Sequence, residues 1–308
     1  MIQDSRQRSR DTEAITLLLL PGLDGTGQLF EPLLEQLPPF IKPLIQNYPV
    51  DASLGYSELG QLVLDNLPND KPIFVLGESF SGPIAMQVAA SRPEQVQGLI
   101  LCCTFVRNPS VMLGLFKRAI DYLPFSHMPH GAMLAMLVNQ ANLPIAAKLA
   151  PILTSLPDQL IRKRLHEVSE IDASAALEQI RCPILSLRGN ADRLVPASAD
   201  KPISLLAGER LQTRTLAGPH ALLQCNPQAV AEELEHFIGA QRRFCESRNP
   251  RLPLLRFLPI LPSSKPVYNF CKLSGGDPAM QPQHHAAGDP HALRLRQRQH
   301  RRHLPRSP

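Results

Sequence analysis

Residues 73–82 read IFVLGESFSG, and this stretch decides the fold. The four apolar residues at its start are typical of a buried strand, and the run GPIAMQVAAS that begins at Gly82 has helical spacing. Between them, Gly77, Ser79 and Ser81 are small residues, which permit a sharp turn where strand and helix pass closely. Such a turn exposes the hydroxyl of Ser79 at the end of a sheet.

Short apolar runs of this kind recur along the chain, and each is followed by a stretch with helical spacing. This alternation predicts an α/β fold, a mostly parallel sheet of about six strands with helices on both faces. The predicted strands are Ile15–Leu20, Lys42–Asn47, Ile73–Leu76, Gly98–Phe105, Ile184–Arg188 and Arg210–Leu216. The predicted helices are Leu29–Gln36, Tyr56–Asn66, Phe80–Ser91 and Pro227–Gln241.

The alternation is interrupted once, between the fourth and fifth predicted strands. Residues 106–182 are rich in Leu, Ala and Met, and they predict a helical insertion that caps one end of the sheet. The core domain is expected over residues 15–243, after a flexible N-terminus over 1–14. Residues 244–308 are rich in Pro and Arg without apolar periodicity, so we expect a disordered basic tail.

The basic charge of the chain is confined to this tail. The net charge is +5, but residues 241–308 hold 13 lysines and arginines against three acids, whereas residues 1–240 hold 19 against 24. The chain also has no Trp and only 5% aromatic residues for base stacking. We therefore expect no specific nucleic-acid partner. Salt-sensitive nonspecific contact through the tail is the alternative, which deletion of residues 245–308 would test.

Membrane insertion and secretion are not indicated by the sequence. The first apolar run, Ala14–Leu23, is too short to span a bilayer, and the uncharged stretch Tyr122–Ala147 contains three prolines. The first residues lack the apolar core of a secretory signal, and the six cysteines are therefore interpreted as reduced thiols. These features predict a cytoplasmic protein without a membrane span.

A serine hydroxyl is a weak nucleophile, which needs a general base that is held by an acid. Residues 189–196 read GNADRLVP and place Asp192 in a turn directly after a predicted strand. His220 follows the last predicted strand, ahead of the helix that begins at Pro227. Because the carboxyl ends of parallel strands share one edge of a sheet, Ser79, Asp192 and His220 are expected to meet. The alternative for Asp192 alone is a turn-stabilising residue.

These motifs resemble those of the α/β-hydrolase family over residues 15–241, roughly. The turn at Ser79 is similar to the G-x-S-x-G nucleophile elbow, with Ser81 in place of the second glycine, and the chain order Ser, acid, His also matches. The resemblance implies a triad of Ser79, Asp192 and His220. It also implies that the backbone N–H groups of Phe80 and Leu23 form the oxyanion hole.

The resemblance implies a serine hydrolase that cleaves a carboxylic ester through an acyl-enzyme on Ser79, with a small-molecule ester or acyl compound as substrate. Met133 and Met136 in an apolar insertion favour an apolar acyl or alcohol part, and the alternative is that these residues only pack the insertion onto the core. Residues 21–27, PGLDGTG, also look like a segment of plastid-type hydrolase-like acyltransferases that esterify phytol and diacylglycerol. Acyl transfer or thioester cleavage by the same triad is therefore an alternative, and a non-catalytic binding module is the alternative outside enzymes. The oligomeric state is not indicated.

No cofactor and no metal are predicted. The chain has neither H-E-x-x-H nor C-x-x-C, and the adjacent Cys102 and Cys103 would point to opposite faces of a strand. The glycine-rich loop after the first strand lacks the spacing of a phosphate-binding loop. In this loop Asp24 is interpreted as a turn-stabilising residue. No role is assigned to Glu78, beside the nucleophile.

Overall fold

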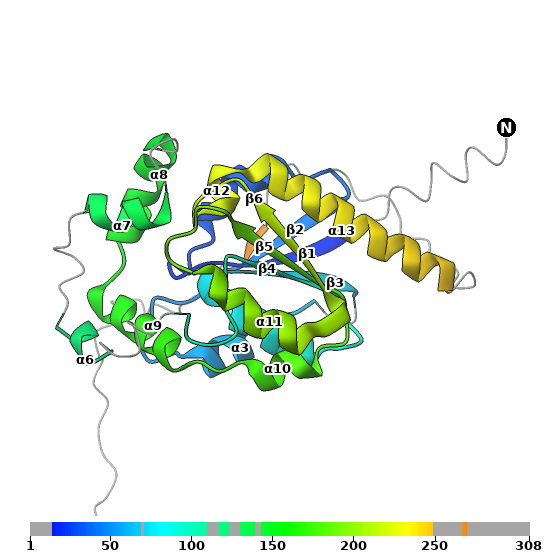
Figure 1. Ribbon diagram of the computed structural model, residues 1–308, viewed down its shortest axis with the longest axis horizontal. Coiled ribbons are helices and arrows are strands. Elements are labelled where there is room, and N and C mark those ends of the chain that lie inside the picture. Colours follow the sequence, from blue (N-terminus) through cyan, green and yellow to red (C-terminus); the bar gives the residue numbers. More distant parts are fainter. Residues whose placement is uncertain are drawn as a thin grey trace, which may run out of the picture. The chain divides into compact units, whose positions relative to one another are not determined.

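Figure 1 shows the computed structural model of the chain. Its described residues are 14–68, 71–109, 117–122, 130–138, 143–248 and 267–269. The predicted flexible N-terminus and most of the predicted disordered tail lie outside these residues. Within the tail region, one helix extends to Arg248 and a short strand spans Val267–Asn269.

A parallel sheet forms the core, with strands in the order β6-β5-β4-β3-β1-β2-β7. All adjacent strand pairs are parallel. The central strand β3 is buried at every position, as expected for a sheet that is covered on both faces. The strands are β1 (Ile15–Leu20), β2 (Ile41–Gln46), β3 (Ile73–Glu78), β4 (Val96–Cys102), β5 (Ile184–Gly189), β6 (Leu211–Leu216) and the short β7 (Val267–Asn269).

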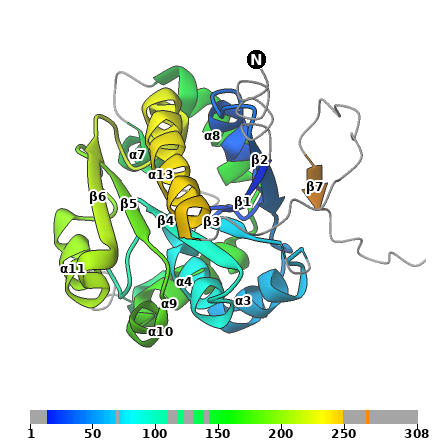
Figure 2. The ribbon, with the colours of Figure 1, turned by 90° about the vertical axis from the view of Figure 1, so that its right-hand side faces the viewer.

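Helices cover both faces of this sheet (Figure 2). Successive residues of a strand point to opposite faces, so the strands contribute to two separate apolar clusters. The helices on one face are α3 (Tyr56–Asp65), α4 (Gly82–Ser91), α10 (Ser174–Gln179) and α11 (Asp200–Ala207). Those on the other face are α2 (Glu31–Leu34), α12 (Leu222–Cys225) and α13 (Pro227–Arg248). The predicted α/β fold with about six parallel strands is confirmed.

Strand β4 ends earlier than the sequence predicts. The apolar run continues to Phe105, but the strand ends at Cys102, and Cys103 has a left-handed backbone with φ of 48°. The expectation that the two thiols point to opposite faces is therefore wrong. Both side chains pack into the same apolar cluster, because the backbone turns between them.

The insertion between β4 and β5 is helical in its described residues, as predicted. Figure 1 shows α7, α8 and α9 at one end of the sheet. One small apolar cluster joins α7 and α8 to Ala221, which follows β6, and another joins α9 to Leu23, which follows β1. The insertion therefore lies over the carboxyl ends of the strands. Between β4 and β5 lie α6 (Lys117–Ile120), α7 (His130–Leu137), α8 (Leu143–Thr154), α9 (Asp158–Glu170) and also α10, which packs on a face of the sheet instead.

Within the described ranges, none of the helices combines the length and the apolar character that crossing a membrane requires.

Candidate active site

Ser79 lies in a tight turn between β3 and α4. A 3₁₀ turn, η2 (Ser79–Ser81), links the end of β3 at Glu78 to the start of α4 at Gly82. The backbone of Ser79 has a φ of 48°, a conformation that costs a non-glycine residue about 1–3 kcal/mol. Such strain at a strand-to-helix turn is typical of a serine whose hydroxyl is presented for reaction.

Two glycines let the strand and the helix pass closely at this turn. A Cβ atom on Gly77 would lie 2.7 Å from both the Ala85 Cβ atom and the Ser81 carbonyl oxygen. A Cβ atom on Gly82 would collide with the side chain of Thr104. The small residues of the motif are therefore required by packing.

The imidazole of His220 lies against the Ser79 hydroxyl. His220 is in the loop after β6, and its Nε2 atom is 2.8 Å from Ser79 Oγ. The ring is only 6% exposed, so water competes little for this contact. This arrangement allows the imidazole to take the hydroxyl proton.

Asp192 lies on the other side of the imidazole, in the turn after β5. Its Oδ2 atom is 2.9 Å from His220 Nδ1, while its Oδ1 atom accepts the N–H groups of Leu194 and Val195 at 2.8 and 2.9 Å. One carboxylate oxygen thus stabilises the turn and the other faces the imidazole. The two interpretations of Asp192 that the sequence offers, turn residue and triad acid, are both compatible with this geometry.

The pKa values of this pair reflect opposing effects. Burial alone would raise the pKa of Asp192, but the hydrogen bond and charge of His220, with the N–H groups of Val195 and Leu194, lower it below its ordinary value. Burial alone would lower the pKa of His220, but the hydrogen bond that it donates to Asp192 and the charges of Cys103, Asp192 and Glu78 raise it overall. The pair therefore favours a carboxylate next to an imidazole that is easily protonated.

A second carboxyl group lies beside the nucleophile, at Glu78. It is buried, and its Oε1 atom accepts a hydrogen bond of 2.9 Å from Gln224 Nε2. Burial raises the pKa of Glu78 to about 7, against the opposing effects of Gln224 and His220. Sequence reasoning assigned this residue no role, although a carboxyl group that ends a buried strand next to Ser79 is itself a signal.

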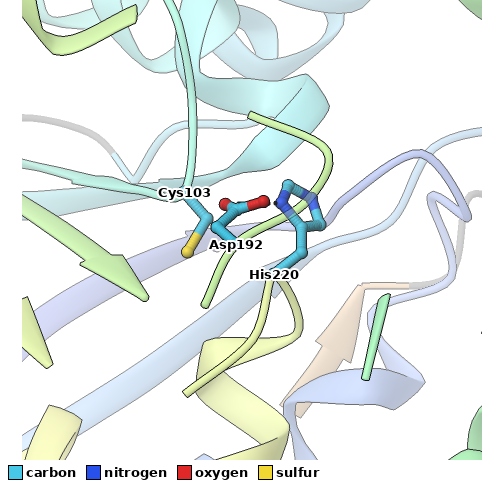
Figure 3. A group of neighbouring side chains, drawn as sticks. All are labelled: Cys103, Asp192 and His220. Carbon is cyan, nitrogen blue, oxygen red and sulfur yellow. Dashed lines mark hydrogen bonds and ion pairs between the residues drawn. The ribbon is translucent and has the colours of Figure 1, made fainter. Parts of the chain in front are cut away.

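Figure 3 shows Cys103 beside Asp192 and His220. Among the described residues, these three form the one group whose potential metal-ligand atoms all lie within 4.8 Å of one another. However, His220 Nδ1 is engaged with Asp192 and His220 Nε2 with Ser79. The imidazole therefore has no free nitrogen for a metal unless the Ser79–His220–Asp192 arrangement is broken.

The loop after β1 lies beside the nucleophile turn. A hydrogen bond of 3.1 Å from the Gly25 N–H group to the Gly22 carbonyl closes this loop, and Asp24 Oδ2 accepts from the backbone and hydroxyl of Thr26 at 2.8 and 2.6 Å. Asp24 is thus a turn-stabilising residue, as predicted. Leu23 lies within the loop, half-buried against α9.

Two residues near this loop were missed by sequence reasoning. Arg164 on α9 is 2% exposed, and its guanidinium contacts the ring of Tyr48, with 5.9 Å between Cζ and the ring centroid. The available signal was spacing: Arg164 lies midway between Leu160 and Val168 on the buried face of α9. A charged residue at such a position indicates a specific partner.

The family model described as "Serine aminopeptidase, S33" matches residues 57–217, which include Ser79, Asp192 and the strands that carry them. The chain belongs to this α/β-hydrolase family. Among solved structures, this hydrolase is similar to a hydrolase from Pseudomonas aeruginosa, with a TM-score of 0.65 and 20% identity over 73% of this chain and 90% of that one. That likeness concerns the fold.

Curated relatives of this hydrolase include the biotin biosynthesis bifunctional protein BioHC of Cellvibrio japonicus. It is 29% identical over 70% of this chain, which spans 44% of the length of that bifunctional protein. The pimeloyl-[acyl-carrier protein] methyl ester esterase of Aeromonas hydrophila is 27% identical over 64% of this chain and 82% of its own length.

Proposed function

We propose that this α/β-hydrolase is a serine esterase in which Ser79 is the nucleophile, His220 the general base and Asp192 the acid. The observation that carries the proposal is the continuous arrangement of the three side chains, with 2.8 Å between Ser79 Oγ and His220 Nε2 and 2.9 Å between His220 Nδ1 and Asp192 Oδ2. The names of the similar esterases favour hydrolysis of an ester over acyl transfer.

The proposed reaction has two halves. Ser79 Oγ forms a bond with the ester carbonyl carbon as its proton passes to His220 Nε2, and the carbonyl oxygen takes the negative charge. The alcohol then leaves with the proton from His220, which leaves an acyl group on Ser79. Water attacks this acyl-enzyme through the same base, so that the acid is released and the proton returns to Ser79. Asp192 orients the imidazole and stabilises its protonated form.

We assign the oxyanion hole to the backbone N–H groups of Leu23 and Phe80. Phe80 directly follows the nucleophile in η2, and Leu23 lies in the loop after β1, which is joined to the nucleophile turn because Ser81 donates to the Pro21 carbonyl oxygen. Two preorganised donors at the developing charge are a large part of the rate enhancement in such enzymes.

A cavity of about 470 Å³ lies between the core and the insertion, and we propose that it holds the acyl chain. Its walls come from η1 (Gln28–Phe30), α2, α8 and Gln224, and Gln224 also contacts Glu78, next to Ser79. The volume is within the range of small-molecule sites. Leu29, Pro32, Ile145, Leu149 and Ile152 supply apolar walls for an aliphatic chain, and the other lining residues, Gln28, Glu31, Lys148 and Gln224, are polar or charged.

Turnover of nitrophenyl esters of increasing chain length tests this function. We expect the wild-type protein to hydrolyse these esters, with the highest kcat/KM at a medium chain length. We expect Ile145→Trp to lower kcat/KM for the octanoate ester about tenfold or more relative to the acetate ester, because the larger ring fills the cavity. Leu205→Trp, on the exposed face of α11, is the matched control and should leave the profile unchanged. Absence of ester hydrolysis by folded protein would contradict the esterase assignment, and an unchanged profile in Ile145→Trp would contradict the cavity assignment.

The pH dependence of kcat/KM should show an acid limb with its midpoint above pH 6.5, the ordinary pKa of histidine. Only neutral His220 accepts the serine proton, and its pKa is raised, so activity is lost as the pH falls through that raised value. The measurement is a kcat/KM profile with a short nitrophenyl ester.

Glu78, with a pKa of about 7, could produce a limb in the same range, and Glu78→Gln separates the two groups. Because the charge of Glu78 raises the pKa of His220, this variant should keep the limb but shift it to lower pH. Disappearance of the limb in Glu78→Gln would assign it to Glu78 instead.

We also propose that the enzyme acts in the cytoplasm on a small-molecule ester. In support, Cys102, Cys103, Cys182 and Cys225 are free thiols in the structure.

A further inference from the structure

Arg164 is a buried cation whose hydrogen bonds go to backbone carbonyls. Nη1 donates to the Leu23 carbonyl oxygen at 2.5 Å, and Nη2 reaches the Pro49 carbonyl oxygen at 3.4 Å. Within the described part of the chain, no carboxylate lies within ion-pair distance of it, and the buried Asp24 acts on it only through its nearby charge. Burying a guanidinium is costly, so this position in α9 indicates a role that an apolar residue could not fill.

The partners of Arg164 include both residues to which we assign the oxyanion donors. Its hydrogen bond holds the Leu23 carbonyl, and its Cζ atom lies 5.7 Å from the centroid of the Phe80 ring, within cation–π range. The opposite side of Phe80 has a partner as well, since its ring stacks on Tyr56 with 4.6 Å between centroids. One guanidinium thus contacts both halves of the proposed oxyanion hole.

Tyr48 forms a second connection between these halves. Its ring lies under the guanidinium, its N–H group donates to the Gly25 carbonyl at 2.8 Å, and its hydroxyl is 2.7 Å from Ser81 Oγ. Burial raises the pKa of Tyr48, so its hydroxyl keeps its proton and donates to Ser81, which in turn donates to the Pro21 carbonyl. A glycine at position 81 could not make this bridge.

The loop backbone is shaped to receive the guanidinium. Gly25 has a φ of 71°, and a Cβ atom there would lie 2.7 Å from Arg164 Nη1. The side chain of Leu23 also packs on the apolar cluster of α9 that contains Leu160 and Ile161. Helix α9 belongs to the insertion, so the insertion supplies contacts that fix the loop.

We propose that Arg164 is a positioning residue that fixes the backbone of Leu23 and Phe80, so that the oxyanion hole is complete only when α9 is docked on the loop. This inference rests on the proposed esterase function. It assigns the insertion a part in catalysis besides covering the substrate.

The test compares Arg164→Met with Arg162→Met, a matched control on the same helix whose guanidinium pairs with Asp158. The substrate is nitrophenyl acetate, and a trifluoromethyl ketone serves as an inhibitor that mimics the tetrahedral intermediate. Ser79 Oγ adds to the ketone carbonyl carbon while its proton passes to His220 Nε2, and the former carbonyl oxygen becomes an oxyanion in the hole. We expect Arg164→Met to lower kcat about 10- to 100-fold, somewhat less than loss of a donor itself, and to weaken binding of the ketone in proportion. KM should change less than about threefold, and Arg162→Met should match wild type.

Several results would overturn the inference. One is an unchanged kcat in folded Arg164→Met. Another is a lower kcat with unchanged binding of the ketone, because that combination indicates a structural role without an effect on the oxyanion hole. If Arg164→Met does not fold, Arg164→Lys replaces it in the test. The lysine ammonium can reach the Leu23 carbonyl, but it cannot contact both carbonyls and both rings at once. Wild-type kcat and wild-type ketone binding in Arg164→Lys would contradict the inference. Wild-type protein that neither hydrolyses the ester nor binds the ketone would instead refute the esterase function.

Discussion

Replacing Ser79 by alanine is expected to lower kcat for ester hydrolysis by about 10⁴- to 10⁶-fold and to abolish labelling by a fluorophosphonate probe. The substitution removes the Oγ atom that lies 2.8 Å from His220 Nε2, and with it the atom that would carry the acyl group. The remaining groups can still bind substrate, so the loss should fall on kcat while KM changes little.

The measurement is turnover of a short nitrophenyl ester together with gel-based detection of the labelled protein. Ser204→Ala is the control, because this serine is exposed on α11, a helix that packs on a face of the sheet, and the variant should label and turn over like wild type. Labelling of Ser79→Ala, or activity above about one part in a hundred, would show that another group is the nucleophile.

The positions of these groups could be predicted because they depend on local patterns. Parallel strands end at one edge of their sheet, so a serine, an aspartate and a histidine that each follow a strand come together once the strand pattern is correct. The apolar runs identified those strands within a few residues. Where the run continued past the true end, as at Cys103, the pattern failed, because left-handed backbone at a non-glycine residue has no signature in apolar spacing.

The supporting groups could not be predicted, because they depend on contacts between distant segments. Arg164 and Leu23 are far apart in the chain, and only the docking of α9 brings them together. Glu78 and Gln224 likewise meet through the fold. In the sequence, Arg164 is one of three consecutive basic residues, Arg162 to Arg164, and only its spacing midway between Leu160 and Val168 distinguishes it, without showing which segment it meets.

Ser81 illustrates both cases. The sequence shows a serine where the elbow motif has its second glycine, and small size is a sufficient reason for tolerance. The structure adds a different reason, since the Ser81 hydroxyl joins Tyr48 to the Pro21 carbonyl. A departure from a motif is therefore a place to search for a contact that the usual residue could not make.

Replacing Asp192 by asparagine is expected to lower kcat by about 10³- to 10⁴-fold while the fold is retained. The amide oxygen of asparagine can still accept the N–H groups of Leu194 and Val195, so the turn after β5 should persist. The amide NH₂ group then faces His220 Nδ1, which must become an acceptor. The proton moves to Nε2, where the imidazole can no longer take the proton of Ser79.

The matched control for this prediction is Asp51→Asn. Asp51 makes a similar turn, accepting the backbone and hydroxyl of Ser53 at 2.8 and 2.7 Å, but it is in an exposed loop before α3. That variant should keep wild-type kcat, which separates the effect of an amide in a turn from the effect on His220.

Retention of more than about a tenth of wild-type kcat by folded Asp192→Asn would show that another acid orients His220. Glu78 is then the candidate, because it is buried beside Ser79 and its charge acts on His220. In that case Glu78→Gln should lower kcat more than Asp192→Asn does. If Asp192 is the acid, as we propose, the order is reversed, and Glu78→Gln mainly shifts the acid limb of the pH profile.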